Sequence, residues 1–202
     1  GLLDLYEASF QIKWLQWAVK LQAIQDELFY EPEQNTYFNT AGGQSDIIVR
    51  MRNSHDGATP SENSISALNL VRLASLTGKM EFSDQATKII LSFQDTLGSH
   101  PQSMSQLLLA TDFLLYKPKQ IILASAKDDP ALPSFLQEIH QRFLPRKVLL
   151  LADGAEGQEY LSKDNPFIEE IQPIDNKPTA FVCEDFVCKL PTNDLTIFRE
   201  RL

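Results

Sequence analysis

The spacing of apolar residues changes once along this chain of 202 residues, after Tyr116, and that change constrains the fold more than any other feature. Before it, apolar side chains recur every three or four positions, as in helices. After it, short apolar runs alternate with helical stretches, a pattern typical of buried strands. We therefore expect an α + α/β chain, with antiparallel helical hairpins over residues 1–117 and a small, mainly parallel α/β unit over residues 118–202.

Four helices are expected in the first part. They run from about Ile12 to Phe29, Ser61 to Thr77, Glu81 to Leu97 and Gln102 to Tyr116. Short turns separate the last three, so neighbouring helices should be antiparallel. The first helix is amphipathic because its apolar residues step at three and four. These residues are Trp14, Trp17, Ala18, Leu21, Ile24 and Leu28.

Residues 30–52 join the first two of these helices and are rich in turn-forming residues. They predict a long ordered loop, with β-favouring runs at Tyr37-Phe38 and Ile47-Ile48-Val49 that suit a hairpin. Loops of this length are commonly functional or disordered.

Strands and helices alternate in the second part. Strands are expected at Gln120 to Ala124, Lys147 to Leu151 and Thr179 to Cys183, and a helix at Leu132 to Phe143. The alternation predicts parallel pairing, with Lys117-Pro118-Lys119 as the joint before the first strand. Thr192 is placed to cap a closing helix that continues to Leu202.

A weak internal repeat connects two parts of the helical region. Leu5, Ser9, Trp14 and Ala18 match Leu73, Thr77, Phe82 and Ala86 at a constant offset of 68 residues. In each copy an apolar helix ends at Ser or Thr and an aromatic residue opens the next helix, which indicates stacked helical hairpins. The alternative is two unrelated helix pairs that share generic turn chemistry.

The composition excludes several classes of protein. A formal net charge of −9 and a pI near 4.8 disfavour a nucleic-acid partner, which would need clustered basic residues. The longest apolar runs fall far short of the roughly 20 residues needed to cross a bilayer. We expect a soluble protein without a membrane partner, with the cytoplasm as the favoured compartment.

The first residues read as the end of a helix, so we expect the chain to be part of a longer protein. Severed helices would leave apolar side chains exposed, particularly Leu2, Leu3, Leu5 and Tyr6, and such patches favour self-association.

The stretch from Asp56 to Ser64 carries the main candidate site. Asp56-Gly57 favours a tight turn, Pro60 suits the first helical turn, and Ser61 or Ser64 can cap the helix. The free N–H groups at such an end attract anions and hydroxyl-rich ligands. The simpler interpretation is that these residues only start the helix that follows. That helix is apolar almost all round and is expected to be buried.

Three further side chains flank this stretch. His55 precedes Asp56, and together they could serve as an acid–base pair near pH 7, although an isolated loop histidine is ordinarily exposed. Arg50 and Arg52 could hold a carboxylate or phosphate, or could form a solvated face.

Cys183 and Cys188 are five residues apart. Five extended steps span roughly 17 Å, so we expect free thiols, because a disulfide would require a sharp chain reversal. Neither cysteine nor the three histidines form a metal-binding motif, and no cofactor motif is present, so neither a metal nor a cofactor is expected. The strand ends at Ser125, Asp153-Gly154 and Cys183-Glu184 are a second candidate site, because ligands gather at the carboxyl ends of parallel strands.

Several motifs, taken in order and spacing over nearly the whole chain, resemble the spermatogenesis-associated protein 20 family. They are Leu2-Leu3-Asp4-Leu5-Tyr6-Glu7, Gln25-Asp26-Glu27-Leu28-Phe29, Tyr37-Phe38, Arg50-x-Arg52, Asp56-Gly57-Ala58-x-Pro60-Ser61-x-Asn63-Ser64, Phe143-x-Pro145-x-Lys147-Val148 and Phe181-Val182-Cys183-Glu184-Asp185-Phe186-x-Cys188.

The resemblance implies a longer parent with a thioredoxin-like redox domain and an (α/α)6 toroid, similar to N-acylglucosamine 2-epimerases and six-hairpin glycosidases. This chain would be the final hairpins of the toroid and the α/β tail. Asp56, Pro60, Ser61, Asn63 and Ser64 would border the toroid's cavity. Tyr37, Phe38, Arg50 and Arg52 would lie on the loop above it. Phe10 stands at a turn where the family commonly has Gly, and Thr59 replaces a frequent Glu, which puts an acid role there in doubt.

Two functions follow as expectations. In the first, the cavity binds a sugar-like small molecule and the parent is expected to be a carbohydrate-active enzyme, with Asp56 and, less directly, His55 as catalytic candidates. Glycoside hydrolysis usually uses two carboxylates, so the chain alone should be inactive. In the second, the region is a non-enzymatic docking or scaffold module that serves the thioredoxin-like domain.

Overall fold

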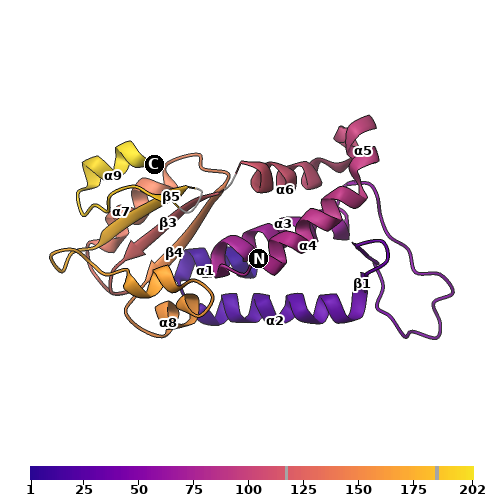
Figure 1. Cartoon of the computed structure of the whole chain (residues 1–202), viewed down its shortest axis with the longest axis horizontal. Helices are drawn as coiled ribbons and strands as arrows, with labels where there is room; N and C mark the ends of the chain where they lie inside the picture. Colours follow the sequence, from indigo (N-terminus) through magenta and orange to yellow (C-terminus); the bar gives the residue numbers. More distant parts are fainter. Residues whose placement is uncertain (117, 185–186) are drawn as a thin grey trace. The chain divides into compact units, whose positions relative to one another are not determined.

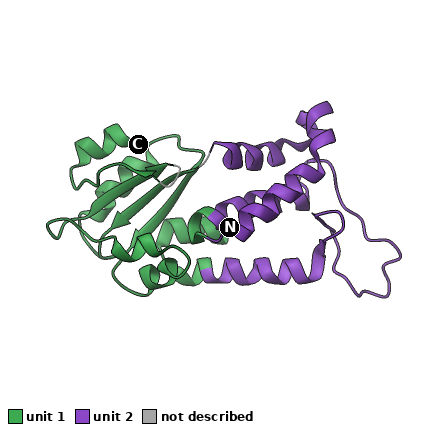
Figure 2. Cartoon of the chain, viewed as in Figure 1, with its two compact units in different colours: residues 1–15, 75–78, 117–202 green, residues 16–74, 79–116 purple. Residues whose placement is uncertain are grey.

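The chain forms two compact units in a computed structural model that describes residues 1–116, 118–184 and 187–202. Unit 1 contains residues 1–15, 75–78 and 117–202, and unit 2 contains residues 16–74 and 79–116 (Figure 2). The expected joint residue Lys117 and the motif residues Asp185 and Phe186 lie outside the described residues. Each unit is described by itself.

Unit 2 is built mainly from helices (Figure 1). Its elements are most of α2 (Ile12–Phe29), β1 (Tyr30–Glu31), β2 (Thr36–Tyr37), most of α3 (Glu62–Thr77), α4 (Met80–Ser92), α5 (Gln94–Ser99), the 3-10 helix η1 (Pro101–Met104) and α6 (Ser105–Leu115). Three helices begin and end close to the predicted residues. The fourth, predicted from Glu81 to Leu97, is interrupted at Phe93, whose buried ring sits on backbone with φ −110° and ψ 14°, outside the helical region.

The loop between α2 and α3 contains the predicted hairpin only near its start, where β1 and β2 pair antiparallel. The second β-favouring run forms no strand. Ile48 and Val49 are 99% and 72% exposed, so no partner strand orders them.

Two helices end at equivalent positions of the proposed repeat. Helix α1 (Leu2–Ser9) ends at Ser9 and α3 ends at Thr77. The next residue in each case has a left-handed backbone, Phe10 with φ 52° and Gly78 with φ 83°. Glycine suits this conformation, whereas phenylalanine is strained there. The Phe10 ring is buried in the core of unit 1, which compensates for the strain.

Unit 1 contains a four-stranded sheet in the order β4-β3-β5-β6. The strands are β3 (Lys119–Ala124), β4 (Lys147–Ala152), β5 (Thr179–Glu184) and β6 (Val187–Cys188), and the helices α7 (Leu132–His140), α8 (Glu156–Ser162), the 3-10 helix η2 (Pro166–Glu170) and α9 (Leu195–Arg201). The predicted strands are present and β3 and β4 are parallel. The expectation of mainly parallel pairing is wrong, because β5 runs antiparallel to β3 and β6 antiparallel to β5.

The direction of β5 follows from the path of the chain before it. Thr179, its first residue, lies opposite Ala124, the last residue of β3. A parallel partner would need a connection back to the other end of the sheet. The chain instead enters β5 at the end where β3 and β4 finish, so the strand runs the opposite way.

A large apolar cluster of unit 1 lies on one face of this sheet. Alternate residues of three strands point to that face, as the two-residue period of a strand requires. Phe135 of α7 and Phe198 of α9 pack on it with ring centroids 5.4 Å apart. The buried members are Phe10, Ile121, Leu123, Leu132, Phe135, Ile139, Leu149, Leu151, Ala180, Val182 and Phe198.

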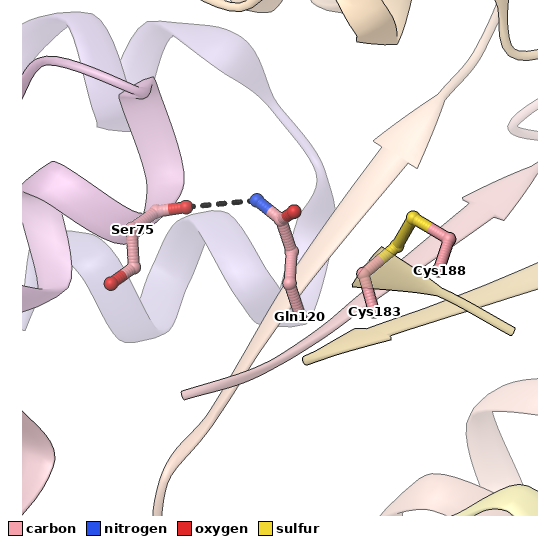
Figure 3. Close-up of a disulfide and its surroundings, with 4 residues drawn as sticks. All are labelled: Ser75, Gln120, Cys183 and Cys188. Carbon is pink, nitrogen blue, oxygen red and sulfur yellow. Dashed lines mark hydrogen bonds between the residues drawn. A yellow bond between two sulfur atoms is a disulfide. The ribbon is translucent and has the colours of Figure 1, made fainter. Parts of the chain in front are cut away.

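The two cysteines form a disulfide, so the expectation of free thiols is wrong (Figure 3). Antiparallel pairing of β5 with β6 places Cys183 opposite Cys188, with Cα atoms 3.9 Å apart. The expectation assumed an extended chain between them, whereas the chain reverses. Beside the disulfide, the amide of Gln120 donates to the carbonyl of Ser75 at 3.0 Å, which satisfies an acceptor in the last turn of α3.

Two smaller expectations also need correction. The closing helix α9 is capped by Asp194, which accepts hydrogen bonds from the N–H groups of Thr196 and Ile197, and Thr192 instead binds the N–H of Asp194. Of the first apolar residues, Leu5 is exposed as expected, but Leu3 and Tyr6 are buried at 5% and 1% exposure.

Candidate functional site

The carboxylate of Asp56 connects two segments of unit 2. Its Oδ1 accepts the N–H of Ser61 at 2.8 Å, and its Oδ2 accepts the N–H of Gln106 near the start of α6, also at 2.8 Å. The N–H of Asp56 donates to the carbonyl of Ser103 at 2.7 Å. Asp56 therefore ties the entry to α3 to the entry to α6.

These contacts favour the charged form of Asp56. Partial burial raises its pKa, but the hydrogen bonds from Ser61, Ser64 and Gln106 lower it by more, so the pKa lies below its ordinary value. A general acid must carry a proton at the working pH. The geometry thus favours a structural role for this carboxylate.

Ser61 caps helix α3, as predicted. Its Oγ accepts the N–H of Ser64 at 3.2 Å and donates to the Ser64 hydroxyl oxygen at 2.9 Å. Both serines are buried. Pro60 precedes the cap and is exposed, so it lies just outside the helix and not in its first turn.

Asn63 holds the strand β2 in place. Its side-chain oxygen accepts the N–H of Tyr37 at 2.7 Å, and its amide donates to the carbonyl of Tyr37 at 3.0 Å. Both residues are fully buried. The side-chain amide of Asn63 therefore satisfies the backbone N–H and carbonyl of Tyr37, as a neighbouring strand would. These two bonds also fix the position of the Tyr37 ring.

The hydroxyl of Tyr37 is the centre of a polar cluster. It donates to Oδ1 of Asp26 and accepts from the amides of Gln22 at 2.9 Å and Gln85 at 2.7 Å. Both amides also donate to Oδ1 of Asp26, each at 2.9 Å. We call Gln22, Asp26, Tyr37 and Gln85 the Tyr37 cluster. It joins α2, β2 and α4.

The environment keeps the Tyr37 hydroxyl protonated. Burial raises its pKa well above the ordinary value, and the hydrogen bond to Asp26 raises it further. The phenol can therefore act as a hydrogen-bond donor at any ordinary pH. Asp26 and Gln85 are only half-buried, as is Gln25, whose amide donates to the hydroxyl of Ser66 at 2.8 Å.

Tyr37 was a candidate from the sequence, but Gln22, Asp26 and Gln85 were not. The two residues of α2 lie opposite the apolar stripe of an amphipathic helix, where polar residues are ordinarily solvated. The four-residue spacing of Gln22 and Asp26 could have indicated them from the sequence, because it places both side chains on one side of the helix.

The remaining candidates lie apart from this cluster. Arg50 donates to the carbonyls of Thr40 at 2.8 Å and Leu28 at 3.0 Å, and its guanidinium lies 4.1 Å from the centre of the Phe38 ring. These contacts fasten the long loop to the end of α2. Arg52 is exposed with one long contact, 3.5 Å, to the hydroxyl of Thr36, and His55 is exposed.

A cleft of about 560 Å³ lies at the carboxyl ends of β3 and β4 in unit 1. Ser125 and Asp153-Gly154, named from the sequence, line it, but Cys183-Glu184 do not, because β5 starts at this end and finishes at the other. Oδ1 of Asp153 accepts the N–H groups of Ala155 and Gln158, each at 3.0 Å. The charged residues that line the cleft are acidic: Asp153, Glu159 and Glu169.

Two further observations concern metal binding and membrane spanning. Within residues 1–116, 118–184 and 187–202, no three His, Cys, Asp or Glu side chains gather so as to hold a metal ion. In that same part of the chain no helix is both long and apolar enough to span a membrane.

A mainly helical unit together with a small mixed sheet defines an α + β protein. No protein-family model matches the sequence. The chain is 36% identical over 206 residues to spermatogenesis-associated protein 20 of Rattus norvegicus and 34% identical over 203 residues to that of Homo sapiens. It is also 27% identical over 200 residues to an uncharacterized protein of Caenorhabditis elegans.

The chain belongs to the spermatogenesis-associated protein 20 family. The matches cover 99–100% of the chain but only 26–27% of each relative. The chain thus spans about a quarter of the length of these relatives.

Proposed function

We propose that unit 2 binds a hydroxyl-rich, sugar-like small molecule at the Tyr37 cluster. The observation that carries the proposal is the convergence of one phenol, one carboxylate and two amides from three elements on a single point. Amides and carboxylates supply the paired donors and acceptors that sugar hydroxyls need. The half-buried side of the cluster, at Asp26 and Gln85, would contact the ligand.

The proposal includes a place for the hairpins in a larger architecture. The repeated turns after Ser9 and Thr77 support stacked helical hairpins, and we propose that they belong to a toroid of such hairpins. The Tyr37 cluster, which lies on the inner side of α2 and α4, would then face the ring's interior.

Binding is proposed for this chain, and hydrolysis is not. Glycoside hydrolysis generally uses two carboxylates about 5–10 Å apart. The Tyr37 cluster supplies one, Asp26, and the contacts of Asp56 favour a structural role. Catalysis by the longer protein would need a second carboxylate from elsewhere.

The test is titration of the chain with a panel of neutral mono- and disaccharides, followed by calorimetry and by amide chemical shifts. We expect at least one sugar to bind and to shift the amide signals of Gln22, Asp26 and Gln85. Gln85→Ala should weaken that binding at least fivefold. The matched control is Gln94→Ala, an exposed glutamine of α5, which should leave it unchanged.

Two results would refute the proposal. One is the absence of binding across the panel by a chain with a cooperative unfolding transition. The other is equal weakening by Gln85→Ala and Gln94→Ala, which would place the ligand away from the Tyr37 cluster.

A further inference from the structure

Helix α2 is 18 residues long (Figure 1). One apolar stripe along it is half exposed. Trp17, Leu21, Ile24 and Leu28 are 51%, 44%, 39% and 40% exposed. We call these four side chains the α2 seam. The opposite side of the helix is turned inward: Ile12 and Leu15 are buried near its start, and Gln22 is buried further along and donates to Tyr37.

The spacing of the α2 seam is that of a helix–helix contact. Its members follow each other by four, three and four residues, which is the a and d pattern of a heptad repeat. Scattered exposed apolar residues are common on protein surfaces, but a regular stripe of large ones along one helix is a mark of an interface. The seam therefore has the geometry to receive a second helix.

The exposed area helps to identify the occupant. The four side chains together expose on the order of 300 Å² of apolar surface. A stable complex between separate chains buries about 800 Å² on each partner. A second copy of this chain docked through the seam alone would be weakly held. A segment of the same polypeptide needs less area, because its effective concentration is high.

We propose that the α2 seam docks an amphipathic helix from the part of the family's polypeptide outside the matched quarter. About three quarters of each relative lies in that part, so it is long enough to supply such a helix. Lys20 and Glu27 are exposed beside the seam. The docked helix would carry an acidic residue near Lys20 and a basic residue near Glu27, in the flanking positions that select partners in paired helices.

The test compares the accessibility of the seam in the chain and in a full-length relative. Leu21→Cys and Ile24→Cys in this chain should react rapidly with a maleimide, at sites mapped by mass spectrometry. Cysteines at the aligned positions of the full-length rat protein should react at least tenfold more slowly. The control is Glu33→Cys on the exposed β1–β2 turn, which should react at a similar rate in both proteins.

The outcomes separate the possible occupants. Slow labelling at the seam positions with fast labelling at the control position supports the proposal, and equal labelling in both proteins overturns it. Sedimentation of the chain alone should show a monomer at micromolar concentration. A dimer that Leu21→Lys dissociates, while Ile48→Lys on the exposed loop does not, would overturn the proposal in favour of a second copy.

Discussion

Both units bury apolar side chains, but a polar cluster lies among those of unit 2. In unit 1, alternate strand residues and the aromatic rings of α7 and α9 form an apolar interior. In unit 2, helices α3 and α4 also bury apolar side chains, but α2 turns Gln22 and Asp26 toward the Tyr37 hydroxyl and leaves the α2 seam half exposed. Unit 1 thus follows the usual rule that the apolar face of an element turns inward, whereas α2 departs from this rule in the part that follows its buried Leu15.

The contrast indicates where stability and specificity reside. An apolar core derives its stability from area removed from water. A buried polar cluster adds little net stability, but each member is costly to remove because its partners lose their hydrogen bonds. We therefore expect substitutions in unit 1 to act on stability, and substitutions around Tyr37 to act mainly on local order and ligand binding.

The largest effect is expected in the core of unit 1. Phe198→Ala should lower the free energy of unfolding by about 3–5 kcal/mol, because the ring is fully buried against Phe135. Urea denaturation measures the change. The neighbouring Ile197 is 40% exposed, and Ile197→Ala should cost less than about 1.5 kcal/mol. Similar losses for both variants would show that the α9 core contact contributes little.

The next effect concerns the turn after α3. Gly78→Ala should cost about 2 kcal/mol or more, because φ is 83° and the added Cβ would lie 2.9 Å from the backbone oxygen of Asp164. Thermal unfolding measures the change. Gly98→Ala is the control, since its Cβ would meet nothing within 4 Å inside helix α5, and it should be neutral or stabilising. Equal tolerance at both positions would contradict the close packing at Gly78.

A smaller effect is expected at the Tyr37 cluster. Tyr37→Phe should cost about 1–2 kcal/mol at neutral pH, because the phenol's partners on Gln22, Asp26 and Gln85 lose a bond. Since the folded pKa is raised, the stabilising contribution is complete below the unfolded value near 10 and is lost as the pH rises above it.

Unfolding experiments between pH 8 and about pH 11 test this dependence. The natural chain should lose stability above pH 10 more steeply than Tyr37→Phe. Tyr6 also has a raised pKa, caused by burial, so a shallower slope should remain in the variant. If the free energy of unfolding fell with pH at the same rate in both proteins, the pKa of Tyr37 would be the same in the folded and unfolded states. Tyr116→Phe, at a tyrosine that is 66% exposed, is the control.

The smallest effect is expected on the α2 seam. Leu21→Gln should change the stability of the chain by less than about 1 kcal/mol, because much of the side chain is already in water. Leu70→Gln, at a fully buried leucine of α3, should cost several kcal/mol, about 3 or more. Comparable losses in the two variants would show that the seam is part of the unit's own core.

The sequence predicted most elements of the fold because local signals agree there with the tertiary structure. The spacing of apolar residues located α2 and α3, and short apolar runs located β3 and β4. The direction of β5 was missed because pairing depends on which end of the sheet the chain enters, and no local pattern encodes it. The disulfide was missed for the same reason, since it depends on the return of β6.

The candidate site was predicted only in part. Ser61, Asn63 and Tyr37 belong to recognisable cap and loop motifs; in the structure Asn63 binds the backbone of Tyr37, and Ser61 caps α3. Asp26 and Gln85 lie on the polar faces of helices, where sequence cannot distinguish a solvated side chain from a buried partner. Arg50 was recognised as a binding residue, but its guanidinium is engaged by carbonyls of its own loop region.

The sequence by itself determined the order of most helices and strands, the ends of two helices at Ser9 and Thr77, and a cap at Ser61 or Ser64, of which the structure shows Ser61. These features depend on side chains a few residues apart, whose preferences are local. Only the tertiary structure decided which face of α2 is inside, which partners surround the Tyr37 hydroxyl, and that Cys183 meets Cys188. Those features depend on residues distant in sequence, brought together by packing that no local preference specifies.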